Sequence, residues 1–215
     1  MKILIVTTNV KNITEDIETG VWLEEFMEPY LKFLENNYDI TIASPNGGIS
    51  PVDPKSIKDE YKKYANVLNE TISIKEAGSS YDLLYIPGGH GCMFDLPDNK
   101  DLAKIIEKMN ENKKIISAIC HGLCGLISAK NKDNTPFVFT KTLTSFTNEE
   151  ENETGLREYM PFLIESKLKE LGANYIKKPE WANFVVEDNR LITGQNQNSA
   201  KQLAKKLILK LENNG

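Results

Sequence analysis

Short apolar runs rich in β-branched residues alternate along this chain with longer amphipathic stretches, and this alternation restricts the chain to few folds. The apolar runs predict strands at 3–8, 40–43, 82–86, 115–119, 184–186 and 191–193. Helical spacing predicts helices at 21–36, 56–69, 101–112, 161–171 and 199–211, with strand and turn at 135–147 and a mobile polar loop at 148–154. This alternation indicates an α/β fold, a mostly parallel sheet with helices on both faces. The active site of such a sheet lies outside the carboxyl ends of its strands.

Composition limits the size of the core and the kinds of partner. The chain has 215 residues, of which 40% are hydrophobic, so we expect one domain over 1–215. A formal net charge of −5 and the absence of a basic block argue against a surface for nucleic acid or an anionic membrane. No apolar run approaches the roughly 18 residues that a membrane-spanning helix needs. Three cysteines without zinc-finger spacing are typical of a reducing, cytoplasmic setting. The expected partner is a small molecule or a protein.

A cysteine and a histidine stand where a predicted strand turns into a predicted helix, in the segment KIISAICHGLCGLISA. Strand-to-helix turns of this kind present nucleophiles in other enzymes. The amide groups and positive dipole at the start of the helix are expected to lower the pKa of the Cys120 thiol and to stabilise an oxyanion. The alternative is an unreactive buried cysteine.

Glycines follow the strand predicted at 82–86. Gly88, Gly89 and Gly91 allow the backbone to approach a ligand closely and to turn its amides toward it. The spacing lacks the pattern of a phosphate-binding loop, and a plain tight turn is the alternative. An amide near Gly89 and the amide of His121 are together candidates for an oxyanion hole.

Glu25 lies on the predicted helix 21–36, on a face that it shares with apolar residues. A carboxyl group buried on such a face has a raised pKa and suits proton transfer near neutral pH. The alternative is a solvated acidic face formed with Glu24 and Glu28.

Seven segments of the chain resemble, in this order, the ThiJ/PfpI superfamily, and within it the heat-shock protein 31 branch of glutathione-independent glyoxalases (glyoxalase III) and chaperones. They are TGVWLEEFMEPYLKF, ITIASPNGGISPVDPKS, LLYIPGGHGCMFDLPDN, IISAICHG, SFTNEEE, MPFLIESKLKELGA and RLITGQNQNSA. The resemblance implies a flavodoxin-like α/β core similar to class I glutamine amidotransferases. It also implies a homodimer.

The resemblance assigns roles to several residues of the predicted site. Cys120 resembles the family nucleophile, His121 its triad histidine, and Glu25 the acid that contacts the cysteine. Glu151 resembles the carboxylate that orients the histidine, with Glu150 as the alternative because three glutamates stand in a row.

Further positions concern binding rather than proton transfer. Gly89, His90 and the amide of His121 match the oxyanion-hole and substrate-binding positions of the family. Glu28 stands where some relatives have a histidine, and the chain has only two histidines. No metal ion and no cofactor are therefore expected.

The implied reaction converts methylglyoxal to lactate without glutathione, through a hemithioacetal on Cys120. A small aldehyde is the implied partner, with chaperone activity toward unfolded proteins or protein deglycation in addition. Two other functions stay open: a holding chaperone in which Cys120 senses redox state, and a hydrolase similar to cysteine peptidases or amidotransferases.

Overall fold

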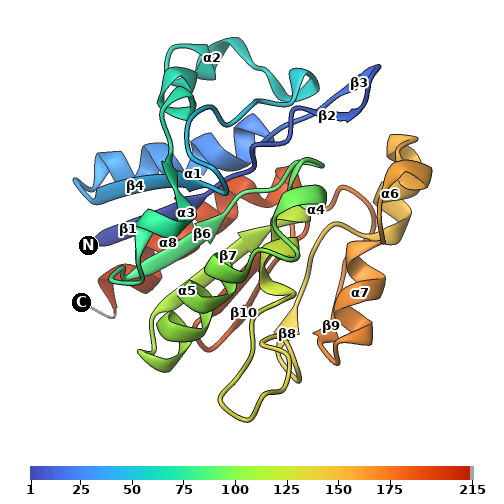
Figure 1. The fold of residues 1–215 in the computed structure, drawn as a ribbon. Helices are drawn as coiled ribbons and strands as arrows, with labels where there is room; N and C mark the ends of the chain where they lie inside the picture. The colour runs from blue at the N-terminus through green and yellow to red at the C-terminus, as the bar shows by residue number, and fades with distance from the viewer. Residues whose placement is uncertain (214–215) are drawn as a thin grey trace.

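The computed structural model describes residues 1–213 as a seven-stranded sheet with helices on both faces (Figure 1). In spatial order the sheet contains β10 (Val185–Asp188), β11 (Leu191–Gly194), β7 (Ile115–Ile119), β6 (Leu83–Ile86), β1 (Lys2–Val6), β4 (Asp39–Ser44) and β5 (Ile72–Ser73). Neighbouring strands run parallel except β10 and β11, which form an antiparallel pair. The predicted doubly wound, mostly parallel sheet is confirmed.

Helices cover both faces of the sheet. Helices α1 and α8 pack against each other on one face, while α3 and α5 lie on the other (Figure 1). The helices are α1 (Leu23–Glu35), α2 (Asp59–Lys62), α3 (Ile74–Ala77), α4 (Cys92–Asp95), α5 (Lys100–Glu111), α6 (Asn148–Thr154), α7 (Ile164–Glu170) and α8 (Ala200–Glu212). Two small sheets pair β2 (Asn12–Thr14) with β3 (Ile17–Glu18) and β8 (Thr142–Leu143) with β9 (Asn174–Tyr175).

The three central strands form the core of the sheet. Strands β1, β6 and β7 are buried along almost their whole length, as expected of parallel strands that are covered on both faces. Continuous Val, Ile and Leu runs supply the apolar surface that both helical layers bury. The strands end at one edge of the sheet, where Thr7, Pro87 and Cys120 follow them directly.

Three predicted elements differ in the structure. The stretch 56–69 contains the short helix α2 and the 3-10 helix Ala65–Asn69, because Tyr61 and Leu68 are its only fully buried apolar side chains and do not form a continuous apolar face. The stretch 148–154 is not a mobile loop but helix α6, which begins with a capping box between Thr147 and Glu150. The helix after Cys120 is a 3-10 helix, Cys120–Leu126.

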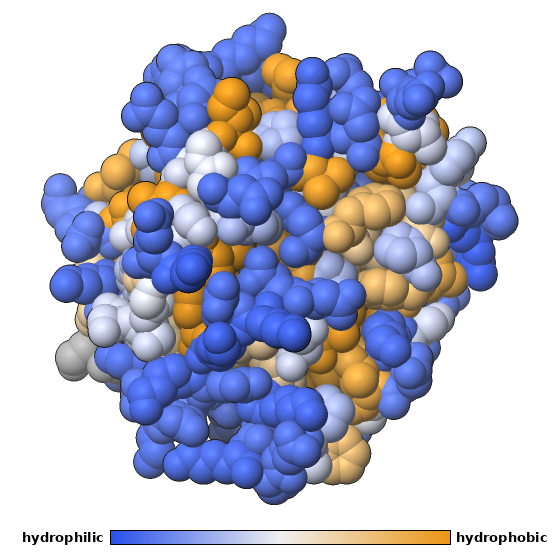
Figure 2. Space-filling model, viewed as in Figure 1, coloured by the Kyte–Doolittle hydropathy of each residue, from blue (hydrophilic) through white to orange (hydrophobic). Residues whose placement is uncertain are grey.

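No helix within residues 1–213 combines the length and the apolar character that crossing a bilayer requires. Figure 2 shows the face over α5 as mainly hydrophilic, with hydrophobic residues in smaller patches among polar ones. Small separated patches are ordinary for a folded domain.

Candidate active site

Cys120 stands directly after β7 in the left-handed backbone conformation, with φ of 56°. This conformation is uncommon for a residue with a side chain and is typical of a strained turn at a functional site. The turn is packed against the end of β6: a Cβ atom at Gly122 would lie 2.3 Å from the carbonyl oxygen of Ile86. Glycine at this position therefore allows the tight turn that presents the Cys120 side chain.

Glu25 of α1 is buried completely beside this turn. Its Oε2 accepts a hydrogen bond from the Gly88 amide at 2.8 Å, while its Oε1 has no partner within residues 1–213. Burial raises the pKa of Glu25 to about 8, although the Gly88 amide and the Cys120 side chain act in the opposite direction. At neutral pH Glu25 is therefore a protonated acid with one oxygen available for proton transfer.

The expectation of a lowered thiol pKa at Cys120 is wrong in this setting. Burial and the negative charge of an ionised Glu25 raise the pKa of the Cys120 thiol, and the backbone amide of His121 lowers it only in part. Two acids thus share one buried site, and the ionisation of one suppresses that of the other.

His121 connects Cys120 to a carboxylate. Its Nδ1 lies 3.4 Å from the Sγ of Cys120, and its Nε2 lies 2.6 Å from Oε2 of Glu151. Burial, together with the neighbouring His90, lowers the pKa of His121, so its imidazole is neutral near pH 7. Donation from Nε2 to Glu151 leaves Nδ1 as the acceptor that faces the thiol.

Of the two glutamates that the sequence left open, Glu151 is the one that contacts His121. Burial acts to raise the pKa of Glu151, but the imidazoles of His121 and His90 hold it well below its usual range. Glu150 faces away and accepts hydrogen bonds from Trp181, Gln195 and other groups.

His90 does not face the cysteine. Its Nε2 lies 2.8 Å from Oε1 of Glu151, and its ring centroid lies 4.2 Å from that of His121. The carboxylate of Glu151 therefore holds two buried imidazoles, one on each oxygen. The family motif predicts that His90 binds the substrate. Its contact with Glu151 joins residues 61 positions apart, so no pattern among neighbouring residues of the sequence predicts this contact.

The glycine loop lies close beside the thiol. A Cβ atom at Gly88 would lie 2.7 Å from Oε2 of Glu25 and 2.8 Å from Cβ of Cys120. Gly89 has φ of 112°, and a Cβ atom there would lie 2.1 Å from the carbonyl oxygen of Gly20. Both positions therefore require glycine. The Gly88 amide is engaged by Glu25, so the predicted oxyanion donors remain the amides of Gly89 and His121.

Two contacts near the site had no signal in the sequence. The hydroxyl of Tyr85 on β6 donates to the carbonyl oxygen of Glu25 at 2.6 Å and so fixes the turn of α1 that presents the carboxyl. The ring of Phe146 lies 4.5 Å from that of His121, centroid to centroid, and 5.7 Å from that of Trp181. Phe146 belongs to the SFTNEEE segment.

Among the described residues 1–213, one group of side chains has the spacing of a metal site. Ligand atoms of His90, His121 and Glu151 lie within 4.8 Å of one another. In the structure both Nε2 atoms and both carboxylate oxygens are engaged in the hydrogen bonds of this cluster. That arrangement orients the imidazoles, and the absence of a metal stays a prediction.

Comparison with known proteins places these residues in a family. Residues 2–210 match the DJ-1/PfpI family. The chain is 30% identical to Glyoxalase 3 of Candida albicans over the full length of both. It is 26% identical to the glutathione-independent glyoxalase HSP31 of Saccharomyces cerevisiae, covering 99% of this chain and 98% of that one. The crystal structure of glyoxalase III from Candida albicans superposes with a TM-score of 0.87 at 28% identity, covering 97% and 96% of the two chains. The chain belongs to the DJ-1/PfpI family.

Proposed function

We propose that the protein is a glutathione-independent glyoxalase that converts methylglyoxal to lactate. The observation that supports this most directly is the buried, protonatable carboxyl of Glu25 beside the Cys120 thiol, with Oε1 unengaged by any residue in 1–213. Proton movement between adjacent carbons requires such an acid next to a nucleophile. The names of the full-length relatives support the same reaction.

The first step forms a bond between Sγ of Cys120 and the aldehyde carbon. His121 takes the thiol proton on Nδ1, and the resulting thiolate adds to the carbonyl. The oxygen of the hemithioacetal takes its proton from the Glu25 carboxyl or from the His121 imidazolium, and the group that gives up its proton becomes the base of the next step. The amides of Gly89 and His121 stabilise the negative oxygen while it forms.

The second step moves hydrogen between the two carbons. Glu25 or His121 removes the proton from the former aldehyde carbon to give an enediol, and a proton is then delivered to the neighbouring carbon, leaving a lactoyl thioester on Cys120. Water attacks the thioester, the bond to sulfur breaks, and lactate and a proton are released. The sum is methylglyoxal plus water to lactate plus a proton, with no net redox change and no glutathione.

The experiment measures lactate formed from methylglyoxal in glutathione-free buffer. We expect activity in the unoxidised wild type and its loss in Cys120→Ala and in Glu25→Gln. Glu24→Gln is the matched control, because Glu24 neighbours Glu25 in sequence but pairs with Lys58 away from the thiol. Full activity in Glu25→Gln would contradict the acid–base role, and an inactive wild type would contradict the reaction itself.

The proposal includes a cellular setting. The three cysteines are free and buried, which is compatible with a reducing cytoplasm. The family resemblance supports a homodimer that protects the cell from reactive aldehydes, with chaperone activity toward unfolded proteins as an additional property. Sedimentation of the purified protein tests the dimer.

A further inference from the structure

Glu150 is a fully buried carboxylate that no step of the proposed reaction uses. Its Oε1 accepts three hydrogen bonds: from the Trp181 amide at 2.8 Å, from Nε2 of Gln195 at 3.0 Å and from Nδ2 of Asn196 at 2.6 Å. All three donors are neutral. A carboxylate buried without a cation depends on such donors, because its desolvation costs free energy.

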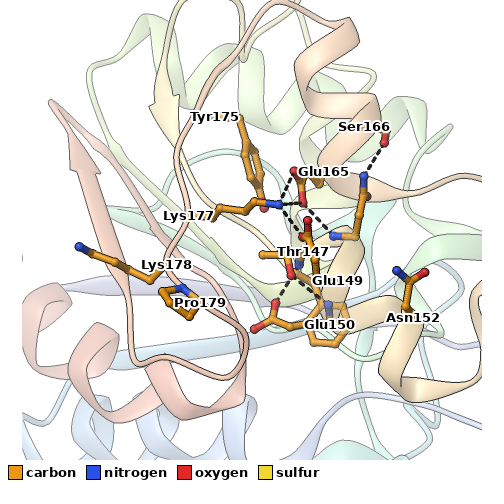
Figure 3. A network of polar contacts seen from close by, with 12 residues as sticks. Thr147, Glu149, Glu150, Asn152, Glu165, Ser166, Tyr175, Lys177, Lys178 and Pro179 are labelled. Carbon is orange, nitrogen blue, oxygen red and sulfur yellow. Dashed lines mark hydrogen bonds and ion pairs between the residues drawn. The ribbon is translucent and has the colours of Figure 1, made fainter.

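The same polar groups hold one segment, the Trp181 loop (178–184). Gln195 accepts from the Lys178 amide, and its Nε2 donates to the carbonyl oxygen of Pro179. Asn196 and Asn198 donate to the carbonyl oxygens of Ala182 and Trp181. Figure 3 shows Pro179 of this loop on the side of the Glu150 carboxyl, with Lys178 pointing away from it. The GQNQNS segment, which the proposed reaction leaves without a role, thus holds this loop.

The Trp181 loop reaches the catalytic imidazole through one aromatic ring. Trp181 has φ of 60°, an uncommon conformation for a bulky residue, which persists only where the surroundings fix it. Its side chain packs edge-on against Phe146, at 5.7 Å between centroids. Phe146 in turn packs against His121 at 4.5 Å. The contacts run from Glu150 through Trp181 and Phe146 to His121.

Helix α6 has anchors besides the capping box that Glu150 forms with Thr147. The carboxylate of Glu165 on α7 accepts from the Asn148 amide at the start of α6. Lys177 bridges Glu149 and Glu165 (Figure 3). Three successive glutamates therefore differ in function: Glu149 joins a partly exposed ion pair, Glu150 holds the Trp181 loop, and the third contacts the imidazoles.

We propose that Glu150 is a positioning residue of the active site, which acts through the Trp181 loop and Phe146 to hold the imidazole of His121 in place. The inference rests on the proposed function, since it concerns the histidine of that reaction. Displacement of the ring would lengthen the contact between Nδ1 and the thiol, and small displacements of a catalytic group cost large factors in rate.

The test compares Glu150→Ala with Glu150→Gln. The amide oxygen of glutamine can still accept the three hydrogen bonds made by Oε1, so this variant loses only the cap contact between Oε2 and the Thr147 amide. Alanine loses all of these contacts. Glu149→Gln is the matched control, because it removes a neighbouring charge that pairs with Lys177.

Two experiments measure three quantities. The first is kcat and KM for methylglyoxal. The second is acrylamide quenching of the Trp181 indole, in a Trp22→Phe background shared by all variants, since the chain has two tryptophans. We expect Glu150→Ala to lower kcat about ten-fold with KM within about two-fold of wild type, and to increase quenching about two-fold. Glu150→Gln and Glu149→Gln should stay within about two-fold of wild type in all three quantities.

Several results would overturn the inference. Equal quenching of Trp181 in Glu150→Ala and wild type would show that Glu150 does not hold the loop. Increased quenching with unchanged kcat would show that the loop does not act on the site. A Glu150→Gln variant as slow as Glu150→Ala would assign the effect to the charge or to the cap contact with Thr147 rather than to the loop. If Glu150→Ala does not fold, Trp181→Ala replaces it, with the same expected loss of kcat. This variant has no indole to quench, so unchanged kcat is the result that would overturn the inference. Inactivity of the wild type toward methylglyoxal would contradict the proposed function alone, because quenching tests the loop contact without substrate.

Discussion

Glu25 and Cys120 approach each other across the backbone of Gly88, although they lie on a helix and on a strand end that are far apart in the sequence. A Cβ atom added to Gly88 would lie 2.7 Å from the carboxylate oxygen of Glu25 and 2.8 Å from Cβ of Cys120. The acid and the nucleophile of the proposed reaction are in contact because this position has no side chain.

Replacement of Gly88 by alanine should therefore separate the two groups. The added methyl group contacts the fixed His121 amide at 2.9 Å as well, so the backbone itself must move. We expect glyoxalase activity to fall at least about 100-fold and the free energy of unfolding to fall by about 1–3 kcal/mol. Gly48→Ala is the control, since a Cβ atom there meets nothing within 4 Å, although its φ of +72° makes the substitution strained. Its stability should fall while its activity stays. Unchanged activity in Gly88→Ala would contradict the contact.

The raised pKa of Glu25 makes the stability of the protein depend on pH in a predictable direction. The folded protein keeps the Glu25 proton up to a pKa of about 8, whereas the unfolded chain releases it near the ordinary value of 4.5. Between these values the folded state binds more protons, so stability falls as pH rises, by up to about 1.4 kcal/mol per pH unit from this group. Below pH 4.5 this contribution is fully present.

Glu25→Gln removes that dependence and serves as the comparison. We expect the wild type to lose stability relative to Glu25→Gln as the pH rises from 5 to 8, as measured by the free energies of unfolding in urea. Other titrating groups are common to both proteins and cancel in the difference. A difference that stays constant over this range would mean that Glu25 ionises normally in the folded state.

Removal of the Glu151 charge should impair the histidine. The carboxylate fixes the tautomer of His121 in which Nδ1 faces the thiol. We expect Glu151→Gln to lower kcat by about 10²- to 10⁴-fold while the protein still folds, because glutamine can reverse the direction of the hydrogen bond. Circular dichroism and steady-state kinetics check both parts. An effect no larger than that of Glu149→Gln would assign no orienting role to Glu151.

His90 offers a choice between two roles that kinetics can separate. The structure joins it to Glu151 rather than to the thiol, so we expect His90→Gln to lower kcat about ten-fold with KM changed by less than about three-fold. A substrate-binding role, as the motif predicts, would instead raise KM and leave kcat largely intact. Initial rates over a range of methylglyoxal concentrations distinguish the two.

The sequence by itself determined the architecture and the kind of chemistry. Uninterrupted apolar runs such as 82–86 and 115–119 must be buried on both faces, and with amphipathic helices between them only a parallel α/β sheet satisfies that need. Because parallel strands end at the same edge of the sheet, this architecture alone predicts that Cys120 lies near the glycines that follow 82–86. Local sequence patterns were sufficient to predict an element wherever the burial of a residue follows from its neighbours in the chain.

Only the tertiary structure decided how the polar groups pair. Polar residues predict a loop at 148–154, yet this stretch is helix α6, because buried Glu150 and Glu151 are satisfied by partners up to 61 residues away in the sequence. The choice of Glu151 over Glu150 and the second imidazole of His90 follow from those distant partners. The raised pKa of the Cys120 thiol also depends on residues distant in the sequence, because desolvation and the charge of Glu25 depend on what packs around Cys120 in space. Hydrophobic periodicity indicates which face of an element is buried, but it does not indicate which buried charged groups contact one another.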